Sequence, residues 1–337
     1  MNPFRRNDVL RTAGGMAARN VAVAFAYWLV GVGGLQLAVV HEQVTPLWPP
    51  TGVAVVALWL LGPRVWPGIA IGAFAVNVAI GPTIGAVLVI AAGNTAAPLV
   101  AYLLLRRVGF QSSLRRLVDV LALVFLGGLG AMLISATVGS LTLLATGVVT
   151  SASFLSTWSV WWTGDAMGVL LVAPLLLVMA TARPAWLRSP LRWLEAAGLL
   201  CAAVVATILA VRSDIALLFP VYPFVVWAAV RFQLSVAIPC ALAGSLIATV
   251  AAGNDAGPFA GADLAVTMVS LQGLNFSLAL IALLLSAIIS ERDQAQHAIE
   301  DTCRQLGEAL TQLSAGSVLT LRNLDALGKS RRTPPAS

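Results

Sequence analysis

Charge is scarce in this sequence. Only 10% of its 337 residues are charged, whereas 59% are hydrophobic and the mean hydropathy is +0.91. Soluble domains carry about 25% charged residues, so the composition excludes a water-soluble globular protein. We expect an all-α integral membrane protein, because apolar runs of spanning length cross a bilayer as helices.

Residues that bind metals or perform catalysis are also few. The two histidines, His41 and His297, fall on opposite predicted sides of the membrane, which excludes a two-histidine metal site within one chain. Cys201 and Cys240 lie inside apolar runs and Cys303 lies in a polar C-terminal segment, so neither a disulfide framework nor a zinc-ligand spacing is present. The chain also has no phosphate-binding loop and no kinase or cyclase signature. We expect no cofactor, no metal and no enzymatic activity.

Long apolar runs dominate the chain. A spanning helix needs about 20 residues, and the runs at 49–61 and 65–80 are shorter. Gly62 and Pro63 separate these two runs, so the pair could instead form a re-entrant hairpin. The sequence therefore predicts a bundle with eight or ten crossings. The runs are 20–40, 49–61, 65–80, 83–105, 117–146, 154–179, 194–211, 215–230, 234–251 and 264–290.

Basic residues are distributed unevenly between these runs. The sequence pI is about 10, but the arginines form short clusters between apolar runs, which indicates membrane orientation rather than nucleic-acid binding. The opposite side holds only Arg212, beside acidic residues. We predict a bacterial inner-membrane protein with both termini in the cytoplasm and residues 1–19 as a cytoplasmic tail. The arginines on the cytoplasmic side are Arg5, Arg6, Arg11, Arg19, Arg64, Arg106, Arg107, Arg115, Arg116, Arg183, Arg188, Arg192 and Arg231.

Two segments resemble each other weakly. "LWPPTGVAVVALWLL" from Leu47 aligns with "LFPVYPFVVWAAVRF" from Leu218, and both would enter the membrane from outside. The match indicates a parallel repeat of the kind found in transporters, where sites often lie between repeats. Shared apolar composition explains it as well.

The composition changes sharply after Ser290. Residues 291–315 continue an imperfect heptad that places Ile299, Cys303, Leu306 and Leu310 on one seam. A cytoplasmic stalk that forms a homodimer is one interpretation, and a solvated helical tail is the other. Because Gly316 ends the pattern, we expect residues 316–337 to be disordered.

Polar side chains inside the apolar runs are candidates for binding an unknown small ligand. Asp165 lies near the middle of the run 154–179, where a carboxylate needs a cation, several donors or water. We predict that Asp165 lines an internal polar cavity rather than facing lipid, either in a ligand- or proton-linked role or within a structural network. Trp158, Trp161 and Trp162 share its helical face. The other candidates are Trp48, Asn77, Asn94, Tyr222, Gln272 and Asn275.

Each of the amides could instead serve a hydrogen bond between helices. Around Asp165 we expect its own aromatic face, the helix carrying Tyr222, and amides such as Asn94 or Gln272. Arg231 is a distant candidate for a cation.

At these residues the chain resembles the integral membrane sensor domain of the MASE type-one family. The resemblance covers about residues 15–290 and rests on "LWPPTGVAVVALWLLGPRVWPGIAIGAFAVN", "GNTAAPLVAYLLLRR", "WWTGDAMGVLLVAPLLL", "FPVYPFVVWAAVRF" and "GPFAGADLAVTMVSLQGLNFSLALIALLLSA", in this order. It implies a bacterial inner-membrane input module, usually followed by a histidine kinase, diguanylate cyclase or phosphodiesterase domain. It implies no established ligand residues.

Two function classes follow. The first is a sensory module at residues 20–290 that passes a ligand- or partner-induced change to the stalk. Its expected partners are membrane lipids, a second copy of the chain, and a separate histidine kinase, cyclase or membrane protein. The second is a small-molecule transporter, indicated by the repeat and the proline-broken helices. A membrane enzyme, with Asp165 as acid or base, is a third interpretation.

Overall fold

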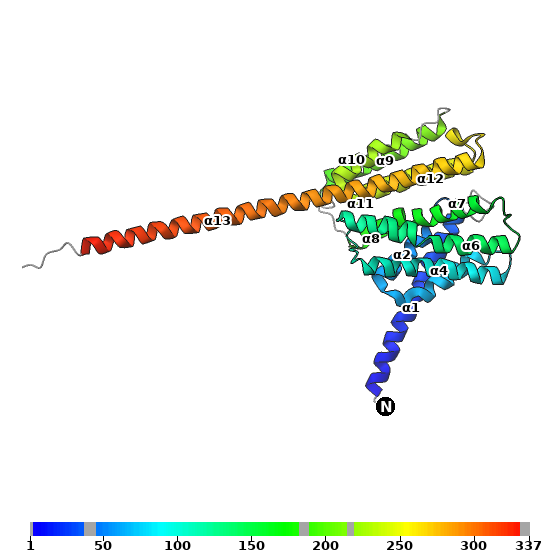
Figure 1. Cartoon of the computed structure of the whole chain (residues 1–337), viewed down its shortest axis with the longest axis horizontal. Coiled ribbons are helices and arrows are strands. Elements are labelled where there is room, and N and C mark those ends of the chain that lie inside the picture. The colour runs from blue at the N-terminus through cyan, green and yellow to red at the C-terminus, as the bar shows by residue number, and fades with distance from the viewer. Residues whose placement is uncertain (1–2, 37–44, 182–188, 214–218, 331–337) are drawn as a thin grey trace, which may run out of the picture. The chain divides into compact units, whose positions relative to one another are not determined.

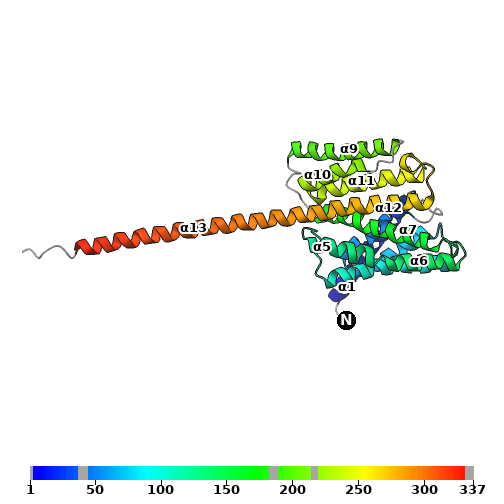
Figure 2. The same ribbon diagram turned by 45° about the horizontal axis from the view of Figure 1, so that its top comes forward.

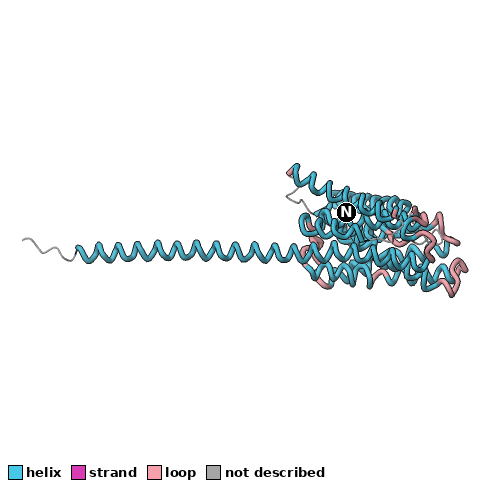
Figure 3. The backbone as a smooth tube through the Cα atoms, turned by 90° about the horizontal axis from the view of Figure 1, so that it is seen from above, coloured by secondary structure: helices cyan, strands magenta, loops and turns pink. Residues whose placement is uncertain are grey.

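The computed structural model describes residues 3–36, 45–181, 189–213 and 219–330. The structure is 85% helical, and the described residues contain no strand (Figure 3). The chain divides into two compact units, Met1–Ile289 and Ser290–Ser337. The prediction of an all-α helical bundle is confirmed.

The helices follow one another with short connections. They are α1 (Pro3–Leu35), α2 (Pro49–Leu61), α3 (Trp66–Asn77), α4 (Ile84–Arg107), α5 (Leu117–Ala122), α6 (Leu133–Ala145), α7 (Phe154–Met167), α8 (Ala173–Thr181), α9 (Pro190–Arg212), α10 (Tyr222–Phe232), α11 (Leu234–Gly253), α12 (Leu264–Leu280) and α13 (Ser286–Ser330). Short 3-10 turns, η1 (Pro63–Val65), η5 (Phe219–Val221) and η6 (Gly257–Phe259), precede α3, α10 and α12.

Three π-helical segments join pairs of these helices into longer spans. They are η2 (Leu123–Gly130) between α5 and α6, η3 (Gly168–Val172) between α7 and α8, and η7 (Ile281–Leu285) between α12 and α13. Pro174 supplies a reason for η3, because proline has no N–H to donate to the carbonyl four residues earlier. π segments are rare and often occur at functional sites.

All ten predicted apolar runs contain helix. Within the described residues, seven helical segments are long and apolar enough to cross a membrane: Gly14–Leu35, Ile84–Arg107, Leu117–Ala145, Phe154–Thr181, Pro190–Arg212, Leu234–Gly253 and Ala265–Glu308. The other three runs contain the shorter helices α2, α3 and α10. The 13 residues of α2 reach about 20 Å, against roughly 30 Å for the hydrocarbon core. Gly62, with φ +88°, makes the turn after α2.

The first unit contains two groups of helices. In the first group α1 packs on α2 and α3, α4 packs on α3 and α6, and α6 packs on α7. In the second group α11 packs on α9, α10 and α12. α8 contacts α11 and α7 contacts α12, which joins the groups (Figures 1 and 2). One hydrophobic core runs across this junction.

Large apolar side chains also cover the outer surfaces of the helices. Phe25 is 59% exposed, Leu88 is 56% exposed and Leu209 is 63% exposed. A water-soluble protein rarely exposes so much contiguous apolar surface, whereas a bilayer covers it. The chain is a multi-pass integral membrane protein.

The expected end of the last helix was wrong. α13 continues through Gly316 to Ser330, so residues 316–330 are helical rather than disordered, and residues 331–337 lie outside the described part. A glycine inside a helix costs only about 1 kcal/mol relative to alanine. No proline follows before Pro334, so the helix is not forced to stop at Gly316.

Arg231 is not a counterion for Asp165. Its guanidinium lies 2.9 Å from a carboxylate oxygen of Glu195, in an ion pair between α10 and α9. A second buried carboxyl, Asp119, does have a cation. Arg116 contacts it through two nitrogens, each at 2.7 Å, and the backbone N–H of Gln111 donates to it at 2.9 Å.

Candidate functional site

Asp165 lies in the interior of the first group of helices, where 1% of its surface is exposed. The hydroxyl of Thr51, on α2, donates to Oδ1 at 2.5 Å, and the hydroxyl of Ser135, on α6, donates to Oδ2 at 2.5 Å. The ring of Trp161 lies one helical turn before Asp165 on α7. The carboxyl therefore joins α2, α6 and α7, and it does not face lipid.

Glycines on α7 allow the start of α2 to reach this carboxyl. Gly164 and Gly168 are spaced as G-x-x-x-G, a pattern that lets helices approach closely. A Cβ on Gly164 would overlap the carbonyl oxygen of Thr45, and one on Gly168 would overlap that of Trp48. The backbone N–H of Trp48 donates to the Gly164 carbonyl at 2.9 Å. This contact places Thr51, one turn further along α2, beside Asp165.

Neutral groups alone make the polar contacts of this carboxyl. No Lys, Arg or His forms an ion pair with Asp165 among the described residues. Donors can replace a cation at a buried acid when they occupy its lone pairs. The charge is tolerated because hydroxyl donors from two other helices, α2 and α6, converge on it.

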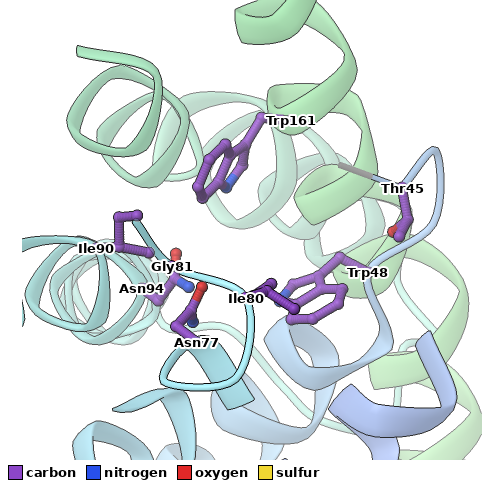
Figure 4. Close-up of a pocket in the computed structure, with 8 residues that line it drawn as sticks. All are labelled: Thr45, Trp48, Asn77, Ile80, Gly81, Ile90, Asn94 and Trp161. Carbon is purple, nitrogen blue, oxygen red and sulfur yellow. The ribbon is translucent and has the colours of Figure 1, made fainter. Parts of the chain in front are cut away.

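A small cavity lies next to this network. Its volume, measured as the space open to the centre of a water molecule, is about 20 Å³, and a cavity of about 10–15 Å³ on this measure already holds one water. Figure 4 shows the rings of Trp48 and Trp161 and the amides of Asn77 and Asn94 around one space. Thr45, Ile80, Gly81 and Ile90 complete the lining. Asp165 itself is not part of the lining, whereas Trp161, one helical turn before it on α7, is.

The amides in the cavity have unused hydrogen-bonding capacity. Asn94 is 6% exposed, and its Oδ1 is buried without a partner among the described residues. Asn77 is 7% exposed and donates through Nδ2 to the carbonyl of Ala73 at 2.8 Å. A buried acceptor without a partner costs about 1–3 kcal/mol. A donor from outside the chain would therefore stabilise Asn94 by bonding to this oxygen.

The tryptophan rings beside the cavity pack closely against other helices. The ring of Trp161 covers Gly139 on α6, where a Cβ would overlap it, and a Cβ on Gly34 of α1 would meet the ring of Trp48. Both rings are therefore held in position by neighbouring helices while they line the cavity.

The remaining predicted residues lie elsewhere. Trp158 and Trp162 stack at 5.6 Å between ring centroids, and they donate to Thr137 and to the Leu129 carbonyl at 3.0 and 2.8 Å. These two rings pack against α6 and η2 and do not line the cavity. Of the three tryptophans predicted on this helical face, Trp161 alone lines it.

Tyr222, Gln272 and Asn275 belong to the second group of helices, so the expected surroundings of Asp165 were wrong in part. Tyr222 and Ser277 share a hydrogen bond of 2.5 Å, and Asn275, fully buried, accepts from Ser245 at 2.7 Å. Gln272 Nε2 and Asn275 Nδ2 are buried without partners in the described part of the chain. None of these contacts reaches Asp165.

Sequence reasoning missed Thr51 and Ser135. Thr51 follows the prolines of "LWPPTG", so the motif itself was a signal, but Ser135 lies in the run "LISATVG" with nothing to distinguish it from a helix-facing hydroxyl. The described residues also contain no group of three or more His, Cys, Asp and Glu that could hold a metal ion.

A comparison with protein families shows which family the chain belongs to. The family model MASE1 matches residues 19–293, most of the chain. The chain belongs to the MASE1 family. MASE1 domains are membrane-associated sensor domains, so this chain contains a sensor domain of signal transduction. No curated protein and no solved structure matches it.

Proposed function

We propose that this MASE1 domain is a sensory input module of the bacterial inner membrane, with both termini in the cytoplasm. A change within the membrane passes along the last helix to the stalk at residues 291–315. The observation that carries the proposal is helical continuity: α12, η7 and α13 follow one another from Leu264 to Ser330 without a break. The proposed role is regulatory and not enzymatic.

Transmission along this helix requires two states that differ in ligand or partner affinity. The π segment η7 supports this requirement, because π segments add a residue to a turn and so alter helical register. It lies in the apolar part of the last helix, where Ala282 and Leu283 are fully buried. A shift between π and α geometry there would rotate the residues that follow.

The partners we propose are membrane lipids, a second copy of the chain along the stalk, and a histidine kinase, cyclase or membrane protein that delivers the output. Ile299, Leu306 and Leu310 are between 59% and 67% exposed on α13. A second helix would bury this seam.

A graft tests the proposal. Residues 1–314 are fused to a diguanylate cyclase, and cyclase activity is measured across growth conditions and with candidate partner proteins. We expect at least one condition to change the output. Inserting seven residues after Gln294 should preserve the response, because the heptad seam is restored. A two-residue insertion turns the seam by about 200° and should abolish the response. An output that no condition alters would overturn the sensory function.

A small-molecule transporter is the alternative, supported by one feature. Both copies of the weak repeat form short helices that begin at prolines, α2 and α10. Counterflow of a labelled substrate mixture in proteoliposomes distinguishes the two functions, because a sensor shows no exchange. The repeat itself stays a prediction.

A further inference from the structure

The cavity beside Asp165 has the chemistry to recognise one class of ligand. We propose that the cavity lined by Trp48, Trp161, Asn77 and Asn94 binds the ammonium group of a small amine. This inference rests on the proposed function, for which it would be the input site, and it names the ligand class.

The first step is the balance of donors and acceptors in the lining. Asn94 Oδ1 is an acceptor without a partner, and Asn77 has committed Nδ2 to Ala73, which leaves its Oδ1 to accept. Both amides therefore have an oxygen available to accept a hydrogen bond, and a ligand that brings donors would satisfy them.

The second step is the aromatic surface. Figure 4 shows the rings of Trp48 and Trp161 facing the same space as the two amides. Tryptophan is the most favourable aromatic residue for binding cations, and the contact is stronger where water is excluded. Indole rings and amide oxygens together form a site for an ammonium group, which supplies three donors and a positive charge.

The third step is charge. None of the residues that line the cavity is Lys, Arg or His, so the described lining offers no group to attract an anion. Asp165 lies one helical turn from Trp161 on α7 and has no ion-pair partner among the described residues. This carboxylate would attract an ammonium ion in the cavity, whereas it would repel an anion.

The fourth step concerns the size of the cavity and its contact with the helices. A volume of about 20 Å³ for a water-sized centre admits a group of a few heavy atoms, such as ammonium or methylammonium. Trp161 lines the cavity, covers Gly139 on α6 and lies one helical turn before Asp165 on α7. A ligand that moves this ring therefore changes the contact between α6 and α7, next to the carboxyl that joins α2, α6 and α7.

The test measures binding without using output. The full chain is placed in phosphatidylglycerol nanodiscs, and its unfolding temperature is followed during titration with methylammonium chloride, sodium chloride at equal ionic strength, and acetamide as a neutral probe. Ligands that bind only the folded state raise its stability. We expect a saturable increase with methylammonium alone. A second set of nanodiscs containing phosphatidylethanolamine distinguishes a lipid amine from a free one: if the head group is the ligand, these nanodiscs start with higher stability and respond less to methylammonium.

Variants locate the binding. Asn94→Leu and Trp161→Phe should each weaken methylammonium binding at least tenfold. Trp158→Phe, on the same helix but outside the cavity, should leave binding unchanged. Asn94→Leu removes an unpaired polar group and keeps the number of side-chain non-hydrogen atoms, so we expect it to fold, and its unfolding temperature without probe checks this.

Three results would overturn the inference: no saturable effect of methylammonium in either lipid, which leaves ordered water as the occupant; equal binding of acetamide; or undiminished binding in both cavity variants. The sensory function fails separately, when the cyclase fusion does not respond to any condition although methylammonium binds.

Discussion

Two buried aspartates have different kinds of hydrogen-bonding partner. Asp119 is paired with Arg116 in a bidentate ion pair. Asp165 accepts from two hydroxyls and has no ion-pair partner among the described residues. The first arrangement joins neighbouring residues at a helix start, while the second joins three helices. Removing Asp165 therefore affects the packing of the bundle as well as local polarity.

Substitutions at Asp165 should separate shape from charge. Asp165→Asn keeps one acceptor, and the hydroxyls of Thr51 and Ser135 can turn to accept from the new amide, so we expect folding with a loss of no more than about 1 kcal/mol and altered output. Asp165→Leu leaves the donors without an acceptor, and we expect a loss of about 1–3 kcal/mol. Thermal unfolding in mild detergent and the output of the cyclase fusion measure the two effects.

Asp301→Leu is the control for this pair, because Asp301 is exposed on α13 and lies outside the network. It should change stability less than Asp165→Leu. Wild-type stability and output in Asp165→Leu would show that the network contributes nothing.

At the scale of helices, close packing of α2 on α7 depends on glycine. Gly168→Ala places a methyl group on the carbonyl oxygen of Trp48, which is backbone and cannot turn away. We expect a loss of about 1–3 kcal/mol and weaker packing of α2. Unfolding temperature and the yield of folded protein in detergent measure the loss.

Gly198→Ala is the matched control on α9. A Cβ there would meet nothing within 4 Å, so alanine should stabilise the helix by about 0.5–1 kcal/mol through reduced backbone entropy. A loss at Gly198 as large as the loss at Gly168 would show that the loss at Gly168 does not come from contact with α2.

The stalk offers a direct test of pairing. Cys303 and Ile299 are exposed on α13, and the heptad places Cys303 on the seam that faces a second copy. Oxidation of native membranes should cross-link two chains through Cys303. The comparison is a variant with Cys201, exposed on α9, as its only cysteine, which should not cross-link to the same extent. Absence of the Cys303 product, together with monomers in mild detergent, would contradict a dimeric stalk.

At the scale of the whole molecule, the arginine distribution predicts orientation. In a cysteine-free background, Ser112→Cys before α5 should react with a membrane-impermeant thiol reagent only after the cells are opened. Ser151→Cys before α7 should react in intact cells, because it lies on the opposite predicted side. Both positions are in described connections between helices. Reversed labelling would place the termini outside the cytoplasm and would remove the stalk from cytoplasmic output proteins.

The sequence alone determined the class of the molecule. Low charge, long apolar runs and arginine clusters each depend on whether a segment lies in lipid or in water. The amino-acid composition of a segment therefore indicates its surroundings without knowledge of the fold. Asp165 could be singled out for the same reason: a carboxyl inside an apolar run must be satisfied, whatever the fold. The ordered motifs that resemble a sensor family were readable as well, and the family match confirms them.

Only the tertiary structure decided which groups satisfy that carboxyl. Thr51 and Ser135 lie far from Asp165 in the chain, and their hydroxyls resemble many others that bond to their own helix. What brings them together is the approach of α2 to α7 at Gly164 and Gly168, a contact between backbones that leaves almost no trace in hydrophobic periodicity. The packing of the helices also separates Tyr222, Gln272 and Asn275 from Asp165 and places Asn94 in the nearby cavity. Two polar side chains inside a membrane can pair only when the fold brings them within hydrogen-bonding distance, and their positions in the sequence do not show this.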